Sequence, residues 1–263
     1  MSRQNFYKEK KARERREVDE ELIVDLVKAE RRKHKKMGGR KLLDKLQGEL
    51  KEAGVKVGRD RFFEILRKYE LLVERRKSST PRTTDSRHRF RTYENLFADF
   101  EPSRVHEAWV SDLTYIRTEE GFMYMSHVTD SYSRKIIGYH ISDSLEAVGC
   151  LEALDQAIKQ LPEGKHPIHH SDRGTQYCCN EYVNRLNKHG LQISMTQENH
   201  CYENSQAERV IGILKDEYSL SYTFNTKLDA LRAARQAVEL YNEDRPHMSH
   251  DNRMPSEVHK QAA

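Results

Sequence analysis

Residues 109–142 read WVSDLTYIRTEEGFMYMSHVTDSYSRKIIGYHIS, and this stretch decides the fold. Its β-branched and aromatic residues form three runs separated by short turns at Gly121 and before Ser133, a pattern typical of consecutive strands. We therefore expect an antiparallel meander. Asp112 breaks the alternation, because a carboxylate stands where an apolar side chain is expected, and burying it is costly unless it is paired or binds metal.

Helical and strand-like patterns alternate after this meander. We expect strands at residues 166–171 and 191–196, and helices at about 144–160, 176–188, 206–220 and 227–242. Alternation of this kind predicts an α/β layer in which the later strands run parallel to the first. The expected fold is a mixed five-stranded sheet flanked by helices.

The N-terminal part predicts a separate, small all-α domain. Its apolar residues form three helical stripes, and Asp60 is a plausible N-cap of the third helix. This layout indicates a helix-turn-helix-like unit. The expected divisions are this unit at 1–74, a basic linker rich in Arg, Ser and Thr at 75–103, the catalytic α/β core at 104–222, and a C-terminal helix and tail at 223–263.

Charge is distributed unevenly along the chain. The first 100 residues hold 29 Lys/Arg against 18 Asp/Glu, a net of +11, whereas the remainder holds 17 against 24, a net of −7. A basic front favours contact with the phosphates of DNA. The candidate contacts there are Arg40, Lys41, Arg59, Arg61, Arg75, Arg76 and Lys77. A helical bundle with a merely solvated basic face is the open alternative.

Hydropathy and cysteine content exclude some classes of protein. No stretch approaches the ~18 consecutive apolar residues of a membrane span, so we expect no membrane partner and a cytoplasmic, nucleoid-associated protein. The four cysteines, Cys150, Cys178, Cys179 and Cys201, form no CxxC pair. Reduced thiols are the preferred interpretation, and zinc bound by His169–His170 and Cys178–Cys179 is disfavoured.

Three acids form the candidate active site: Asp112 in the first strand, Asp172 at the end of the fourth, and Glu208 in the helix after the fifth. Singly, each has an ordinary explanation, and Asp172 in particular suits a helix cap. Together at a sheet edge they suit Mg²⁺, which prefers oxygen ligands. Two such ions, with Mn²⁺ as an expected substitute, would support in-line phosphoryl transfer on DNA.

Two polar residues surround the third acid. Asn204 precedes Glu208 by four residues and Lys215 follows it by seven, so all three share one face of a helix. A cation at this position is suited to hold a DNA end beside the metal site. His170 and Gln176 either contact substrate or serve strand-end packing and helix initiation, and these alternatives stay open.

Several motifs in order resemble the integrase core of OrfB-type insertion-sequence transposases, the family expressed by frameshifting between two reading frames. They are WVSDLTYI, VTDSYSRKIIGYHIS, HHSDRGTQY, ISMTQENHCYENSQAERVIGILKDEY and YNEDRPH. The resemblance covers about residues 104–258. One departure is Glu203, because the family commonly has Asp before this Asn. That exchange puts local hydrogen bonding in question.

The resemblance implies an RNase H-like fold and a DDE triad on Asp112, Asp172 and Glu208. It further implies Mg²⁺-dependent cleavage of double-stranded DNA at inverted-repeat ends and joining to a target, by a copy-out then paste-in route. A dimer or larger assembly on DNA and an upstream-frame OrfA partner are also implied. Lys215 matches the family's basic residue, and Arg245 and His247 match its closing motif.

Two further functions remain open at this point. A DNA-binding regulator that retains the integrase fold would bind without cleaving. A nuclease for RNA–DNA hybrids would share the metal site but would not need the basic N-terminal part, the linker or YNEDRPH. The intact set of three acids favours an active transposase.

Overall fold

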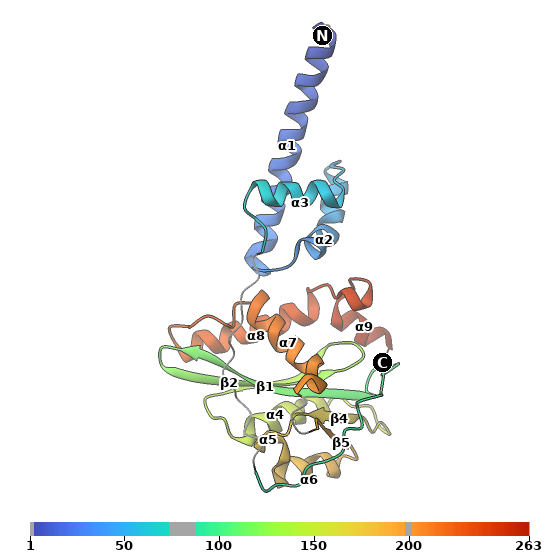
Figure 1. The fold of residues 1–263 in the computed structure, drawn as a ribbon, viewed down its shortest axis with the longest axis vertical. Helices are drawn as coiled ribbons and strands as arrows, with labels where there is room; N and C mark the ends of the chain where they lie inside the picture. The colour runs from blue at the N-terminus through green and yellow to red at the C-terminus, as the bar shows by residue number, and fades with distance from the viewer. Residues whose placement is uncertain (1–2, 74–87, 198–200, 263) are drawn as a thin grey trace. The chain divides into compact units, whose positions relative to one another are not determined.

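The computed structural model describes residues 3–73, 88–197 and 201–262. The chain divides into two compact units, Met1–Ser78 and Ser79–Ala263, coloured blue to cyan and green to red in Figure 1. Arg75, Arg76 and Lys77 lie outside the described residues, so their contact with DNA stays a prediction. No helix of the described ranges is long and apolar enough to cross a membrane.

The N-terminal unit contains three helices, α1 (Arg3–Lys33), α2 (Gly39–Glu52) and α3 (Arg59–Lys68). Residues 9–17 belong to α1. The three apolar stripes meet in one core, because a stripe at helical spacing must be buried against another element. The core includes Ile23, Val27, Leu42, Leu46, Phe62 and Leu66.

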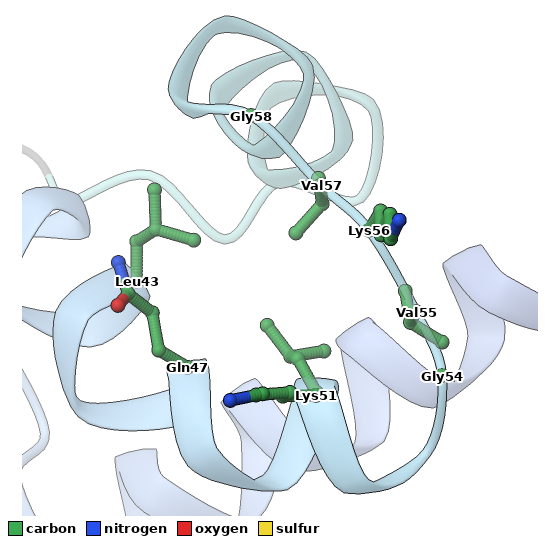
Figure 2. A pocket seen from close by; sticks show the side chains of 9 residues that line it. Leu43, Gln47, Lys51, Gly54, Val55, Lys56, Val57 and Gly58 are labelled. Atoms are coloured by element: carbon green, nitrogen blue, oxygen red, sulfur yellow. The ribbon is translucent and has the colours of Figure 1, made fainter.

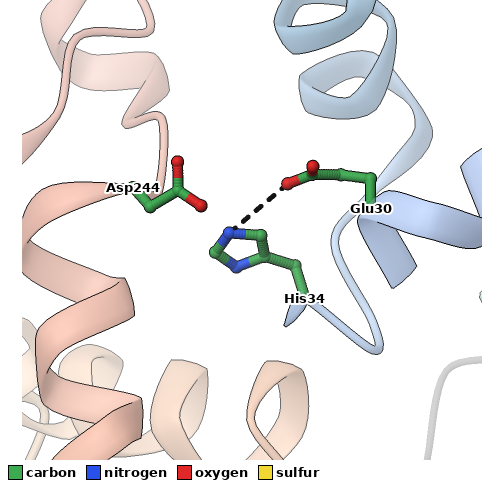
Figure 3. Close-up of side chains that lie close together, drawn as sticks. All are labelled: Glu30, His34 and Asp244. Carbon is green, nitrogen blue, oxygen red and sulfur yellow. Dashed lines mark ion pairs between the residues drawn. The ribbon is translucent and has the colours of Figure 1, made fainter. Parts of the chain in front are cut away.

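Buried acids tie α1 to the other two helices. Glu20 is 6% exposed and accepts hydrogen bonds from Arg61 and Lys68 of α3. Glu30 pairs with His34 at 3.5 Å, as Figure 3 shows, and with Lys45 of α2 at 3.7 Å. Each acid thus pairs with a cation of another helix, and these pairs help to fix the helices' arrangement.

The expected N-cap of α3 is wrong. Gly58 occupies the cap position without a side-chain hydrogen bond, and Asp60 lies in the first turn, accepting from Arg59 Nε at 2.9 Å. An acid in the first turn still interacts favourably with the helix dipole.

A surface cavity of about 440 Å³ lies between α2 and the segment that leads to α3 (Figure 2). Leu43 and Val57 supply its apolar walls, and Gln47, Lys51 and Lys56 supply its polar groups. The lining contains no acid, histidine or cysteine, so this cavity lacks the side chains that usually bind metals.

The second unit is built on a five-stranded sheet in the order β3-β2-β1-β4-β5. Its strands are β1 (Ala108–Thr118), β2 (Gly121–Asp130), β3 (Ile136–Ser142), β4 (Ile168–Ser171) and β5 (Gln192–Met195). The first three form the expected antiparallel meander, and β4 and β5 run parallel to β1. The prediction of a mixed five-stranded sheet is confirmed, with β1 at its centre.

Helices cover both faces of this sheet (Figure 1). They are α4 (Ala147–Ile158), α5 (Thr175–Cys178), α6 (Asn180–Lys188), α7 (Ser205–Glu217), α8 (Lys227–Glu243) and α9 (Pro255–Ala262). On one face Trp109 packs with Leu154, Tyr182 and Leu186. On the other, Ile116 packs with helices α7 and α8, through residues such as Val210, Ile213 and Val238.

The helical boundaries differ from expectation at two places. The single helix expected at 176–188 is broken at Cys179, whose backbone is extended at φ −66° and ψ 150°. The tail expected after the last long helix contains α9, which begins at Pro255, a residue well suited to the first position of a helix.

Part of the expected linker lies against the sheet. Met195 N donates to Glu94 O, and Leu96 N donates to Ser194 Oγ at 2.9 Å. Residues 94–96 therefore cover the edge strand β5, and a covered edge has fewer unpaired backbone groups.

Gly138 is required by the close approach of α4 to β3. A Cβ at this position would lie 2.0 Å from Ala153 O, so we expect Gly138→Ala to lower the free energy of unfolding by at least about 1–3 kcal/mol. Urea titration measures this change. Gly212→Ala is the matched control, because its Cβ meets nothing within 4 Å and alanine favours a helix. Equal stabilities would contradict the close packing.

Candidate functional site

The pairing of β1 with β4 brings two of the three acids to the same end of the two strands. Val110 lies opposite His170 in the last pair, and every pair of this register differs by 60 residues. Asp112 and Asp172 also differ by 60, and each follows the last pair by two residues. The charge of Asp172 acts on Asp112, so the two carboxylates belong to one cluster.

Glu208 lies in the first turn of α7, and hydrogen bonds on both sides fix the start of that helix. Asn204, at its N-cap position, donates from Nδ2 to Ser111 O at 3.0 Å. The pairing of β4 with β1 ends at Val110. The Asn204 side chain therefore binds a carbonyl of β1 that lies beyond the end of this pairing. Ser131 Oγ donates to Gln206 Oε1 at 2.7 Å. The helix that carries Glu208 is therefore fastened beside Asp112.

The three acids interact through their charges. Burial raises the pKa of Asp112 well above its usual value, and the charges of Asp172 and Glu208 raise it further. Leu113 N, which donates to Asp112 Oδ1 at 2.7 Å, and the charge of Lys215 oppose this rise. Burial and then the charge of Asp172 raise the pKa of Glu208. Three mutually repelling carboxylates would gain stability from a cation.

The donor set fits Mg²⁺. Its groups are hard carboxylate oxygens, and the buried Oδ1 of Asn204 is an acceptor with no hydrogen-bond partner in the described part of the chain. The three acids are not among the described groups whose ligand atoms all lie within 4.8 Å of one another. Their oxygens are thus further apart than the ligands of one closed metal site.

Asp172 does not cap a helix. The N-cap position of α5 belongs to Gly174, and Asp172 Oδ1 accepts from Gly174 N at 2.9 Å. A Cβ on Gly174 would lie 3.0 Å from that oxygen. The Asp-Arg-Gly turn therefore sets the direction of the carboxylate, and the glycine leaves it room.

Lys215 lies two turns further along α7. Its Nζ is 4.4 Å from the ring centroid of Tyr115. Burial lowers the pKa of Lys215, and the charge of Asp112 opposes that change. The interaction of Lys215 with the charge of Asp112 agrees with the prediction that this lysine lies close to the acids.

Arg245 is not an exposed DNA contact. The side chain is 1% exposed, and its Nε and Nη2 donate to the two carboxylate oxygens of Glu217 at 2.8 Å. Burial lowers the pKa of Arg245, but the hydrogen bonds and charge of Glu217 outweigh it, so the pKa is raised. A bidentate buried pair of this kind holds α7 against the end of α8.

Asn204 also needs correction as a direct DNA contact, because it is 3% exposed and engaged with Ser111. His247 is half-buried, with its ring edge-on to Tyr241 at 5.5 Å. Of the other candidate contacts, Arg61 pairs with Glu20 and Glu64, Arg59 pairs with Asp60, and Arg40 and Lys41 lie in the first turn of α2.

Three neighbouring side chains make contacts within the protein. His170 Nδ1 lies 2.9 Å from Ser194 Oγ, and its ring stacks on Phe97. Gln176 Nε2 donates to Leu145 O at 2.9 Å. Burial raises the pKa of the Cys178 thiol to about 12. The contacts of His170 and Gln176 are of the packing type, and their roles toward substrate stay predictions.

Asn95 is a neighbour of the site that sequence reasoning missed, and it contacts Glu203. Glu203 Oε2 accepts from Asn95 Nδ2 at 2.8 Å and from Gln197 N at 2.6 Å. Glu203, the longer acid that departs from the family pattern, thus connects three segments of the chain. The departure was the signal that hydrogen bonding differs here, but the partner, Asn95, lies 108 residues away in the sequence.

Comparisons with known proteins agree with this geometry. Residues 102–201 and 189–255 match two family models, each described as integrase core domain. The insertion element IS600 uncharacterized 31 kDa protein of Shigella sonnei is 33% identical over 260 residues, which cover 97% of this chain and 94% of that protein. The transposase for insertion sequence element IS629 of Shigella sonnei is 32% identical over 62% of this chain and 55% of its own.

The fold is also that of a solved structure. A chain of the simian T-cell lymphotropic virus intasome, in complex with PP2A regulatory subunit B56 gamma, aligns with a TM-score of 0.52 and 15% identity, covering 85% of this chain and 70% of its own. The sheet and its flanking helices therefore define an integrase-type, RNase H-like core, as the motifs imply. Polynucleotidyl transferases are the class of enzyme built on this core.

Within that class, the chain belongs to the insertion-sequence transposase family with an integrase core. The resemblance drawn from the motifs is confirmed.

The pair between Arg245 and Glu217 predicts a structural role for the arginine. We expect Arg245→Ala to lower the free energy of unfolding by about 3–5 kcal/mol, because Glu217 would keep a charge without its partner. Urea titration checks this. Arg235→Ala, which removes an exposed arginine on α8 of the same unit, should change stability by no more than about 0.5 kcal/mol. If Arg245→Ala left stability unchanged but weakened DNA binding, Arg245 would be a DNA contact after all.

Gly174 predicts a test of the Asp172 turn. We expect Gly174→Ala to slow DNA cleavage and joining by about 100-fold, since the added methyl displaces the carboxylate and small misplacements at a reacting centre are costly. Rates with a labelled element end measure this effect, and the melting temperature should stay close to that of the parent chain. Full activity would mean that the turn does not set the carboxylate's direction.

Proposed function

We propose that this protein catalyses Mg²⁺-dependent cleavage and joining of DNA at the inverted-repeat ends of an insertion sequence, with Asp112, Asp172 and Glu208 as the metal-holding residues. The observation that supports this proposal is the convergence of three acids: Asp112 on β1, Asp172 just after β4, and Glu208 on α7, whose start is tied to β1 by the hydrogen bond from Asn204 to Ser111 O. The charges of Asp172 and Glu208 raise the pKa of Asp112, and such a group of acids is costly unless a cation binds there.

Bound Mg²⁺, as two ions for which Mn²⁺ can substitute, would supply activation of the attacking oxygen and charge stabilisation at the leaving oxygen. The chain's own residues orient the groups. The β1–β4 register sets the positions of Asp112 and Asp172. Asn204 and Gln206 hold the start of α7, and hence Glu208, through Ser111 and Ser131.

The reaction has two chemical steps. First, a water oxygen forms a bond to phosphorus and the P–O3′ bond breaks, which leaves a 3′-hydroxyl on the element. Second, that hydroxyl attacks another phosphodiester, loses its proton, and displaces a 3′ oxygen that gains one. In the copy-out route the second step joins one end of the element to the other on the same strand, and replication then yields a circle that is pasted into a target.

DNA contact is assigned to cations outside the acidic cluster. Lys215 is the one held beside Asp112. In the helical unit, Arg40, Lys41 and Arg59 are candidates for phosphate contact, as are Arg75, Arg76 and Lys77 of the linker. Because two element ends must be brought together, we propose a dimer or larger assembly on DNA, with the upstream-frame OrfA product as a partner or fusion.

The triad is tested by substitution. We expect Asp112→Asn, Asp172→Asn and Glu208→Gln each to abolish cleavage and joining of a labelled duplex that carries the element's end. Folding should survive, because removing one charge from a repelling cluster relieves electrostatic strain. Denaturing gels follow the nick and the joined product, with and without Mg²⁺.

A second readout separates metal binding from turnover. Mg²⁺ should raise the melting temperature of the parent chain, since a ligand that binds the folded state stabilises it, and should have less effect on Asp172→Asn. Glu181→Gln, an exposed acid on α6, is the matched control and should behave as the parent. Near-full activity in any triad variant would remove that acid from the assignment. Binding without cleavage by the parent would favour a regulator.

A further inference from the structure

Aromatic and cationic side chains gather on the β1–β2 hairpin beyond Asp112. Tyr115 is the centre of this group. Lys215 Nζ lies 4.4 Å and Arg117 Cζ 5.7 Å from its ring centroid, and the ring of Phe122 meets it edge-on at 5.5 Å and 85°. We call Tyr115, Arg117, Phe122 and Lys215 the aromatic strip.

The register places the three hairpin residues of the strip on one surface. Arg117 lies directly opposite Phe122, and Tyr115 is two residues before Arg117, so these three side chains are on the same face of the hairpin. Phe122 is 51% exposed, and Arg117 is exposed as well. The strip therefore offers a free aromatic ring beside two positive charges.

Lys215 connects the strip to the acidic cluster. Tyr115 follows Asp112 by three residues along β1, a distance of roughly 10 Å, and the alternation of a strand places these two side chains on opposite faces. Lys215 of α7 reaches both, because its Nζ lies 4.4 Å from the ring centroid of Tyr115 and its charge interacts with that of Asp112.

The hairpin turn contains two acids: Glu120, which accepts from Lys227 N at 2.8 Å, and Glu119, which is exposed. The spacing of roughly 10 Å along β1 places the strip within a few nucleotides of a phosphate bound at the acids.

We propose that the aromatic strip binds unpaired nucleotides of the DNA strand next to the scissile phosphate. Phe122 stacks on one base, Arg117 and Lys215 contact the phosphates on either side, and Tyr115 is a positioning residue that holds both cations. The occupant is an unpaired strand because a base inside a duplex has both faces covered by its neighbours. Base–aromatic stacking beside a cationic track is how single strands are bound.

This inference rests on the proposed function, and its test uses the full chain carrying Asp172→Asn, without Mg²⁺. The probe is a duplex with a three-nucleotide unpaired end that contains 2-aminopurine, whose fluorescence falls on stacking. We expect quenching on binding. Phe122→Ala should abolish the quenching and weaken binding of this probe about tenfold, with less than a twofold effect on a fully paired duplex. Tyr115→Phe should match the parent, because the ring is retained.

Two controls match the exposure and charge of the strip. Met248→Ala removes an apolar side chain that is 60% exposed, and Lys188→Gln removes an exposed cation on α6. Neither should alter binding of the unpaired probe, whereas Arg117→Gln should weaken it. Equal losses in the controls and the strip variants would overturn the proposal.

Joining of ends is measured with Mg²⁺ on the chain that lacks Asp172→Asn, so that failure of this inference can be distinguished from failure of the proposed function. The inference alone fails under two conditions. The chain must join ends, and its Phe122→Ala variant must bind the unpaired probe and join ends as well as the parent does. If the parent joins no ends while the probe is still quenched, the proposed reaction fails and the strip stands. Loss of self-association in Phe122→Ala, with probe binding unchanged, would make the strip a protein interface and overturn the inference.

Discussion

The parallel pairing of β1 with β4 is the constraint on which the candidate site depends. It sets an offset of 60 residues between the strands, and this offset brings Asp112 and Asp172 to the same end of the pairing. Carboxylates that lie close together repel each other more strongly where water is partly excluded. Burial and then the charge of Asp172 raise the pKa of Asp112, and a bound cation would relieve this repulsion.

The position of the third acid depends on side-chain hydrogen bonds rather than on the sheet. Asn204 binds Ser111 O, Gln206 binds Ser131, and Glu203 binds Asn95 and Gln197 N. Each bond joins the start of α7 to a different segment of the chain. A functional group is held best when its supporting shell is itself fixed, and here that shell is made of ordinary polar residues.

The tertiary structure decides which cations are paired with acids inside the protein. Arg245 and Arg61 both suggested DNA contacts from their sequence context, yet one is buried against Glu217 and the other is paired with Glu20. Lys215, by contrast, is held between an aromatic ring and the acidic cluster. The role of a basic residue thus depends on whether the fold places an acid close to it. The net charge of the chain does not reveal this.

Local pattern was sufficient for much of this protein. The alternation in residues 109–142 predicted the meander, the helical stripes predicted α1 to α3, and the motif order predicted the integrase core. Periodicity is a property of short stretches, so it can predict the elements from local sequence. The expected parallel arrangement then placed Asp112 on one strand and Asp172 at the end of its neighbour. The triad's role and the DNA contacts remain proposals.

Only the tertiary structure decided the contacts between distant residues. The break at Cys179, the link between Glu203 and Asn95, the burial of Arg245 and the aromatic strip each depend on partners that no local pattern specifies. The sequence by itself determined the sheet, most of the helices and the family to which the chain belongs. Packing decided which of those side chains face one another, because a contact is the joint outcome of every element that surrounds it.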